Sequence, residues 1–253
     1  MQIDLTGKIA LVTGATGQLG RVMARTLAAC GADVAVHYHG NRAKAEELCA
    51  ELTAMGRRAL AVQADVGDPA SVAAMGRAVA EGLGWPHIVV ANAVAQYQWT
   101  TVLNQDPADY ESQFRSCVMH NVLLAQTFVP AMAKRGYGRY VGINTECSIE
   151  ALPTQSAYVA GKRGMDGVLR TLAKEVGASG VTVNQVAPGW TISDRDRETG
   201  TERSEVYEAK VPMARRGTDQ EIANAVAFLA SDLASFITGA FLPVCGGKVM
   251  VAI

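Results

Sequence analysis

Tyr158 and Lys162 stand four residues apart in the segment SAYVAGKRGMDGVLRTLAKEV, and their types and spacing suit acid–base chemistry. The segment has few β-branched residues and its apolar positions recur every three or four residues, which predicts a helix. Residues i and i+4 share one face of a helix, so the phenol and the ammonium lie one above the other. A neighbouring cation favours the phenolate and lowers a phenol pKa that is ordinarily about 10. The pair is therefore a candidate acid–base device for a carbonyl or an alcohol.

A glycine-rich segment, TGATGQLG from Thr13 to Gly20, lies between an apolar run and a helical pattern. Glycines in such a place permit a tight turn and a close approach of the backbone to a pyrophosphate. The N–H groups at the start of the following helix attract phosphate. An ordinary βα turn is the alternative, but the position after a first strand favours a dinucleotide site. Its expected members are Gly14, Thr16, Gly17, Gln18, Leu19 and Gly20.

Short apolar runs rich in β-branched residues alternate with helical patterns along the chain. The expected strands are KIALVTG, DVAVHY, RALAVQA, HIVVAN, GRYVGIN, VTVNQVAP and AFLPV. The expected helices lie near Gly20–Cys30, Arg42–Met55, Pro69–Glu81, Pro107–Lys134, Gln155–Ala178 and Asp219–Ala230. This alternation predicts an α/β fold with a doubly wound, Rossmann-like parallel sheet of about seven strands and helices on both faces. Residues 1–253 are expected to form one domain.

The stretch ISDRDRETGTERSE, from Ile192 to Glu205, is strongly charged and nearly free of apolar residues. It is either a solvated loop with a short helix or a mobile lid over a pocket, because long loops in compact domains are often lids. The lid is expected to span residues 192–215.

The second expected strand decides between NAD and NADP. An acid near its end typically binds the ribose diol of NAD, yet Asp33 lies at the wrong end and no acid follows until Glu46. His37, His39 and Arg42 can instead face a 2′-phosphate, although Arg42 can also be a solvated residue at a helix start. NADP is therefore expected, with NAD possible. The two histidines have no carboxylate or thiol nearby in sequence, so no metal site is expected.

Composition excludes several function classes. The apolar content of 49% excludes a disordered chain, and the net charge of −1 without a basic run argues against nucleic-acid binding. No stretch of 18 apolar residues predicts a membrane span. The five cysteines are scattered without a CxxC pair, which indicates reduced thiols in a cytoplasmic protein.

Further segments, together with the glycine turn and the Tyr158–Lys162 pair, carry a family resemblance. These are Ala64-Asp65-Val66, Met119-His120-Asn121-Val122, Pro188-Gly189-Trp190 and the C-terminal stretch PMARRGTDQEIANAVAFLASDLASFITGAFLPVCGG. With them the chain resembles short-chain dehydrogenases/reductases nearly end to end. It is most similar to the compact single-domain branch that includes 3-oxoacyl-acyl-carrier-protein reductases and sugar or polyol dehydrogenases.

The resemblance implies roles for individual residues. Tyr158 is the expected acid–base residue, Lys162 lowers its pKa and holds the nicotinamide ribose, and Asn121 carries a water that links Lys162 to solvent. Asp65 is expected to contact adenine. The remaining cofactor residues implied in this way are Val66, Asn92, Ala93, Pro188, Gly189 and Thr191.

Three departures from the family pattern are visible. Gln18 stands where the compact branch usually has glycine, and Ala91 and Val94 replace two residues of its Asn-Asn-Ala-Gly loop. Thr145 occupies the place of the catalytic serine, thirteen residues before the tyrosine, and its hydroxyl offers the same donor and acceptor. Ser148 is a nearby alternative with the wrong spacing.

The implied reaction is hydride transfer between NADP and the carbonyl or secondary alcohol of a small molecule. The expected substrate residues are Gln96, Trp99, Thr145, Tyr158 and Trp190, which suit an aromatic or alicyclic ketone, although lone aromatic residues are as often packing residues. An NAD-dependent alcohol or sugar-alcohol dehydrogenase is one alternative. A cofactor-binding regulator that has lost its chemistry is another.

Two long helices carry apolar residues on more than one face, among them Leu123, Leu124, Phe128, Met165, Val168 and Leu172. A second exposed apolar face is costly, so a homo-oligomer is expected. The apolar C-terminal GGKVMVAI favours a tetramer over a dimer.

Overall fold

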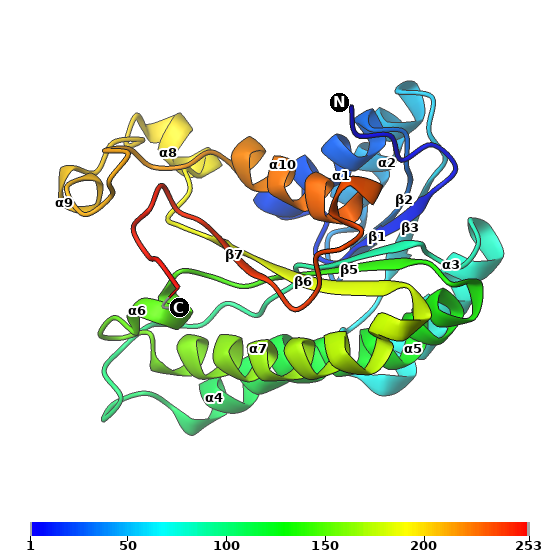
Figure 1. Ribbon diagram of the computed structural model, residues 1–253. Helices are drawn as coiled ribbons and strands as arrows, with labels where there is room; N and C mark the ends of the chain where they lie inside the picture. Colours follow the sequence, from blue (N-terminus) through cyan, green and yellow to red (C-terminus); the bar gives the residue numbers. More distant parts are fainter. Residues whose placement is uncertain (1, 252–253) are drawn as a thin grey trace.

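The computed structural model describes residues 2–251 and contains one parallel sheet of seven strands in the order β3-β2-β1-β4-β5-β6-β7 (Figure 1). This confirms the predicted fold class. The strands are β1 (Ile9–Val12), β2 (Asp33–Tyr38), β3 (Ala59–Gln63), β4 (Ile88–Ala91), β5 (Gly138–Ile143), β6 (Val181–Pro188) and β7 (Phe241–Val244).

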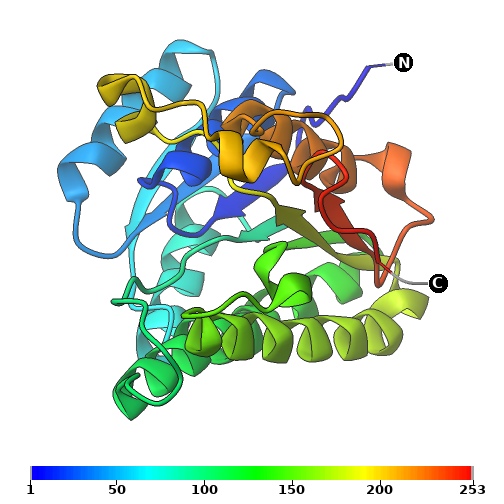
Figure 2. The same ribbon diagram turned by 90° about the vertical axis from the view of Figure 1, so that its left-hand side faces the viewer.

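Helices cover both faces of the sheet. One face carries α1 (Gln18–Ala29), α2 (Arg42–Ala54) and α10 (Asp219–Ala230), and the other carries α3 (Pro69–Gly82), α5 (His120–Arg135) and α7 (Ser156–Val176) (Figures 1 and 2). Successive strand residues alternate between the two faces. In β1, Ala10 and Val12 enter one buried cluster while Ile9 and Leu11 enter the other, and both faces are therefore apolar.

The strand order reverses at β1, which pairs with β2 on one side and β4 on the other. Val12 at the end of β1 pairs with both Val36 and Val90. The loops that follow these strands therefore diverge at the carboxyl edge of the sheet, where open α/β sheets bind their ligands.

The expected helix Pro107–Lys134 is divided into α4 (Pro107–Gln113), a π-helical segment η1 (Phe114–Met119) and α5. α7 packs closely against α4 and η1, since a Cβ on Gly161 would lie 2.9 Å from the carbonyl oxygen of Gln113 in α4 and 3.2 Å from the Cβ of Cys117 in η1. π-helical turns of this kind are frequent at functional sites, and Asn121 is the second residue of the helix α5 that follows this one.

The charged segment after β6 forms two short helices, α8 (Asp194–Thr199) and α9 (Glu205–Glu208), above the carboxyl edge of the sheet (Figure 1). Its two ends are joined, since Thr191 bridges to Gly217. The buried Arg216 guanidinium donates to the carbonyl of Thr191 at 2.8 Å and to Asp196 at 2.8 Å. The segment is therefore a closed loop with a fixed base.

Three short helices complete the fold: α6 (Cys147–Glu150), η2 (Gly177–Ser179) and η3 (Asp232–Ala234). Among residues 2–251 there is no helix whose length and apolarity would allow it to cross a bilayer.

The apolar residues taken as evidence for a subunit interface lie mostly inside the chain. Leu123, Leu124, Phe128 and Met165 are buried in the cluster beneath the sheet. Only Val168 and Leu172 of the six remain partly exposed. The sequence argument from a second apolar face was wrong for the four buried residues, because α5, α7 and the sheet cover one another's apolar sides.

Candidate active site

The glycine turn after β1 needs glycine at two positions in particular. Gly14 has φ +61°, which favours glycine, and a Cβ on Gly20 would lie 2.1 Å from the carbonyl oxygen of Gly14. Gly17 is the N-cap of α1, so the first N–H groups of that helix face the turn. Free N–H groups and a helix dipole at a glycine-rich turn fit a dinucleotide pyrophosphate.

Side chains from neighbouring strands hold this turn. The Asn92 side-chain amide donates to the carbonyl of Thr13 at 2.9 Å, and the Asn92 backbone N–H donates to the Thr13 hydroxyl at 2.9 Å. The loop after β4 therefore keeps its link to the turn although Ala91 and Val94 depart from the family pattern.

His37 lines the groove and supports the same turn from β2 with both ring nitrogens, so its contact with a 2′-phosphate stays a prediction. Its Nδ1 accepts from the Gly14 N–H at 2.9 Å, and its Nε2 lies 3.1 Å from the carbonyl of Ala64, to which it donates in this tautomer. Burial lowers the pKa of His37 to about 4, so the ring is neutral. The pairing of β2 with β1 places the His37 side chain under the turn. The spacing of residues in the sequence does not show this position.

A groove of about 820 Å³ extends from the glycine turn along the carboxyl edge of the sheet. Its walls include eleven of the predicted cofactor residues, namely Gly14, Thr16, Gly17, Gln18, Leu19, Gly20, His39, Asp65, Val66, Asn92 and Ala93. Arg42 is not in these walls; its side chain is exposed and pairs with Glu46 at 2.7 Å. Pro188, Thr191 and Lys162 are also outside them, and Gly189 and Tyr158 line a second cavity.

The groove also contains residues that sequence reasoning missed. Ser112, Arg115 and Ser116 line it from α4 and η1. Only the tertiary structure brings this helix to the groove, and no motif around Arg115 marks it in the sequence.

Gln18, which replaces a family glycine, has a defined contact. Its side-chain amide donates to the carbonyl of Ile192 at 2.6 Å. The glycine turn is thereby joined to the base of the 192–215 segment, a connection that glycine cannot make.

Lys162, Thr145 and Tyr158 meet where β5 and α7 adjoin. The Lys162 ammonium is buried, donates to the carbonyl of Ile143 at 2.5 Å and lies 5.7 Å from the centre of the Tyr158 ring. The Thr145 hydroxyl accepts from the Cys147 N–H at 3.2 Å. The Ser148 hydroxyl is buried and donates to the carbonyl of Thr145 at 2.8 Å, so it is directed away from the cavity that Thr145 lines.

Asn121 lies behind this group, in the first turn of α5. Its amide N–H donates to the carbonyl of Cys117 at 2.7 Å, and its side-chain oxygen accepts from the Tyr140 hydroxyl at 2.9 Å. Its side chain is therefore fixed by η1 and β5, and the water that would link Asn121 to Lys162 stays a prediction.

The pKa of Tyr158 differs from the expected direction. Burial raises this pKa above its usual value, and the nearby Thr145 hydroxyl opposes the rise. Burial also lowers the pKa of Lys162. Desolvation is thus the largest cause of both shifts.

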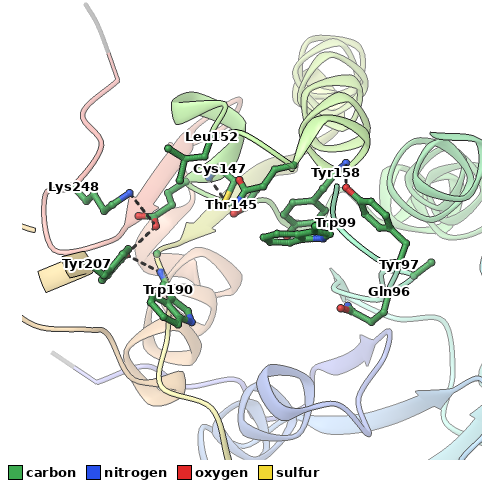
Figure 3. A pocket seen from close by; sticks show the side chains of 14 residues that line it. Gln96, Tyr97, Trp99, Thr145, Cys147, Leu152, Tyr158, Trp190, Tyr207 and Lys248 are labelled. Carbon is green, nitrogen blue, oxygen red and sulfur yellow. Dashed lines mark hydrogen bonds and ion pairs between the residues drawn. The ribbon is translucent and has the colours of Figure 1, made fainter. Parts of the chain in front are cut away.

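A second cavity of about 520 Å³ opens beside Tyr158 and contains the five predicted substrate residues, Gln96, Trp99, Thr145, Tyr158 and Trp190 (Figure 3). Trp99 stacks on Tyr158 with ring centres 6.0 Å apart. Ala95 and Gln96 belong to the walls of both cavities, which therefore meet at this segment.

The chain also resembles known proteins along nearly its whole length. A family model described as enoyl-(acyl carrier protein) reductase matches residues 14–248. The 3-oxoacyl-[acyl-carrier-protein] reductase of Staphylococcus aureus is 36% identical over 96% of this chain and 98% of its own. The corresponding reductase of Escherichia coli K12 is 36% identical over 98% of this chain and 100% of its own.

The chain belongs to the short-chain dehydrogenase/reductase family. This confirms the resemblance read from its motifs, and with it the assignment as an oxidoreductase.

Solved structures agree with this placement. A blue fluorescent protein from a metagenomic library, solved in complex with NADPH, is 34% identical, covers 98% of this chain and 100% of its own, and superposes with a TM-score of 0.90. A gluconate dehydrogenase structure from Agrobacterium tumefaciens, itself named as putative, is 26% identical over 100% of both chains with a TM-score of 0.92.

Proposed function

We propose that this enzyme reduces a ketone of a small molecule to a secondary alcohol with NADPH. The observation that carries the proposal is the junction of the two cavities: Tyr158 and Thr145 line one of them, and it opens at Ala95 and Gln96 into a groove that fits a dinucleotide. Tyr158 is protonated near neutral pH, as a carbonyl reduction requires of the group that gives the proton.

Tyr158, Thr145 and Lys162 have different roles in the proposed reaction. A nicotinamide cofactor supplies the hydride when bound. Tyr158 donates its phenolic proton to the carbonyl oxygen as that oxygen gains charge, and the Thr145 hydroxyl hydrogen-bonds the same oxygen and fixes its position. The buried Lys162 ammonium stabilises the phenolate that remains.

The test is a titration of the purified protein with NADPH and with NADH, followed by a panel of ketones and secondary alcohols with the tighter cofactor. Turnover of ketones with NADPH supports the proposal. Preferred oxidation of alcohols with NAD would favour the dehydrogenase alternative, and cofactor binding without any turnover would favour the regulator.

We expect NADPH to bind at least about tenfold more tightly than NADH, because one charge-assisted contact to a phosphate supplies that ratio. The NADPH-bound structural relative supports this choice, as does the end of β2, where His39, Gly40 and Asn41 line the groove without an acid. Fluorescence titration measures both dissociation constants.

Arg42→Ala is expected to reduce that preference for NADPH. Arg58→Ala is the matched control, since Arg58 is also exposed but pairs with Asp33 at the far end of β2. Equal affinity for the two cofactors in the wild-type protein would contradict the NADP assignment. An unchanged preference in Arg42→Ala would indicate that another cation, such as Arg115, contacts the 2′-phosphate.

Thr145→Ser is expected to keep ketone turnover within a few-fold, because the hydroxyl is retained. Thr145→Ala is expected to lower kcat by about 10²-fold, as loss of one donor to a developing oxyanion does. Steady-state kinetics of the two variants beside Ser148→Ala measure this. If Thr145→Ala left kcat unchanged while Ser148→Ala lowered it strongly, Ser148 would be the residue that hydrogen-bonds the carbonyl oxygen.

The segment 192–215 is proposed as a lid that moves on its fixed base, and Trp190 at that base lines the substrate cavity.

We also propose a homo-oligomer, with a tetramer favoured over a dimer. This proposal rests on the exposed Phe114 and the partly exposed Val168 and Leu172 on neighbouring helices. The five free cysteines support a reducing, cytoplasmic location.

A further inference from the structure

One wall of the substrate cavity is built from charged groups that the proposed reaction does not use. Glu146, Tyr207 and Lys248 all line the cavity. The Tyr207 hydroxyl donates to Glu146 Oε1 at 2.9 Å, and the Lys248 ammonium lies 3.5 Å from the same oxygen. Figure 3 shows Tyr207 and Lys248 together on one side of the cavity, with Trp99 and Tyr158 on the other.

The Tyr207 and Lys248 donors of this wall already have partners within the protein. The Lys248 side chain is 3% exposed and its ammonium is shared between Glu146 and Glu150. The Tyr207 hydroxyl has a single proton, which it gives to Glu146, while it accepts from the Trp190 N–H at 2.8 Å. The Tyr207 hydroxyl is therefore not free to donate to a substrate, and the Lys248 ammonium is held by the two carboxylates.

The acceptors of the wall are not all engaged. Glu146 is 3% exposed, and within residues 2–251 its Oε2 has no hydrogen-bond partner. Gln155 lines the same cavity, is 9% exposed, and its Oε1 is likewise without a partner among these residues. Glu146 lines the cavity, and an ionised carboxylate carries only acceptors, so a rotation of this side chain would present the unpartnered oxygen to a ligand there.

Lys248 joins Glu146 in the cavity wall to Glu150 outside it. This cluster of three side chains holds two carboxylates and one ammonium. Burial raises the pKa of Glu146, while Tyr207 and Lys248 oppose the rise. Burial also acts against the charge of Lys248, but its bonds to the two carboxylates outweigh this and raise its pKa. Lys248 thus stays charged beside Glu146.

Leaving a buried carboxylate oxygen without a partner is costly, and a ligand that donates to it removes this cost. The rest of the cavity is largely apolar, with Trp99, Leu152 and Trp190 in its walls. We propose that the substrate is a ketone with an apolar body that carries a hydrogen-bond donor, a hydroxyl or an ammonium group, bound by Glu146 and assisted by Gln155. That the substrate is a ketone rests on the proposed function. Binding of a donor group by Glu146 does not depend on turnover.

The test uses ketones built on one aryl-alkyl skeleton that differ only in a terminal group: hydroxymethyl, aminomethyl, methyl or carboxylate. Steady-state reduction with NADPH ranks them by kcat/KM. Calorimetric titration of the matching secondary alcohols, in the presence of NADP⁺, ranks them by binding even where no turnover occurs. Hydroxyl or ammonium forms are expected to exceed the methyl form by about 10- to 100-fold, since bonds to a charged group contribute on that scale.

Two variants assign the effect. Glu146→Gln keeps the volume and one acceptor but removes the charge, so it should lower binding of the ammonium form by at least about tenfold, lower the hydroxyl form less, and improve the carboxylate form. Glu150→Gln is the control, because it also removes a carboxylate from Lys248 but is not part of the cavity wall. It should preserve the wild-type order.

The outcomes separate the two proposals. Binding preference for donors without any ketone turnover would keep the donor site and overturn the reductase function. Turnover of all four ketones, with the methyl or carboxylate form equal to or above the donor forms, would overturn the donor site and keep the reductase function. Should Glu146→Gln fail to fold, as judged by circular dichroism, the wild-type ranking still decides the question.

Discussion

Tyr158→Phe is expected to lower ketone turnover by about 10³-fold or more while NADPH affinity stays within a few-fold of the wild-type value. The change removes only the phenolic oxygen, whose proton the reduction needs. The ring remains, so its stacking on Trp99 at 6.0 Å and the shape of the cavity are retained. Single-turnover reduction and fluorescence titration of NADPH measure the two quantities separately.

Tyr97→Phe is the matched control for this variant. It also removes a hydroxyl from the substrate cavity, and that hydroxyl accepts from the Tyr158 backbone N–H at 2.8 Å. Its loss should shift the position of Tyr158 slightly and cost far less activity. If Tyr158→Phe retained turnover within tenfold of the parent, the proton would have to come from another group and the regulator alternative would gain support.

Gly20→Ala is expected to weaken NADPH binding by at least about 10²-fold and to lower the free energy of unfolding by a few kcal/mol. The added Cβ would lie 2.1 Å from the carbonyl oxygen of Gly14 and 2.8 Å from the Ala15 Cα. Both are backbone atoms, so the glycine turn itself must move, and the N–H groups of α1 lose their position toward the pyrophosphate. Fluorescence titration and thermal unfolding measure the two effects.

The control for this variant is Gly177→Ala, at the end of α7. A Cβ there meets nothing within 4 Å, and the backbone already has helical angles of φ −56° and ψ −42°. Gly177→Ala should leave the affinity for NADPH unchanged and the free energy of unfolding nearly unchanged. Unaltered NADPH affinity in Gly20→Ala would show that the cofactor does not rest on this turn.

The local features of this protein were predictable because each depends on residues close in sequence. The alternation of β-branched runs with helical patterns predicted the parallel sheet, and the segment from Thr13 to Gly20 predicted the turn that begins the dinucleotide groove. The spacing of Tyr158 and Lys162 predicted that both would lie on one side of α7, since the helix itself fixes that geometry.

The electrostatic state of those residues was not predictable in the same way. Proximity to Lys162 suggested a lowered pKa for Tyr158, whereas burial raises it. Burial is a property of the packed molecule, contributed by η1, β5 and the loop that carries Trp99, and desolvation then decides the sign.

Local residue patterns were therefore enough to predict the fold class, the glycine turn and the Tyr158–Lys162 pair. Three other contacts depend on the folded chain: His37 supports the turn, Gln18 donates to Ile192, and Lys248 and Tyr207 both contact Glu146. Each of these contacts joins segments far apart in the chain, and its existence depends on strand order and helix packing. A local residue pattern carries no information about such contacts, because the tertiary fold brings their partners together from distant parts of the chain.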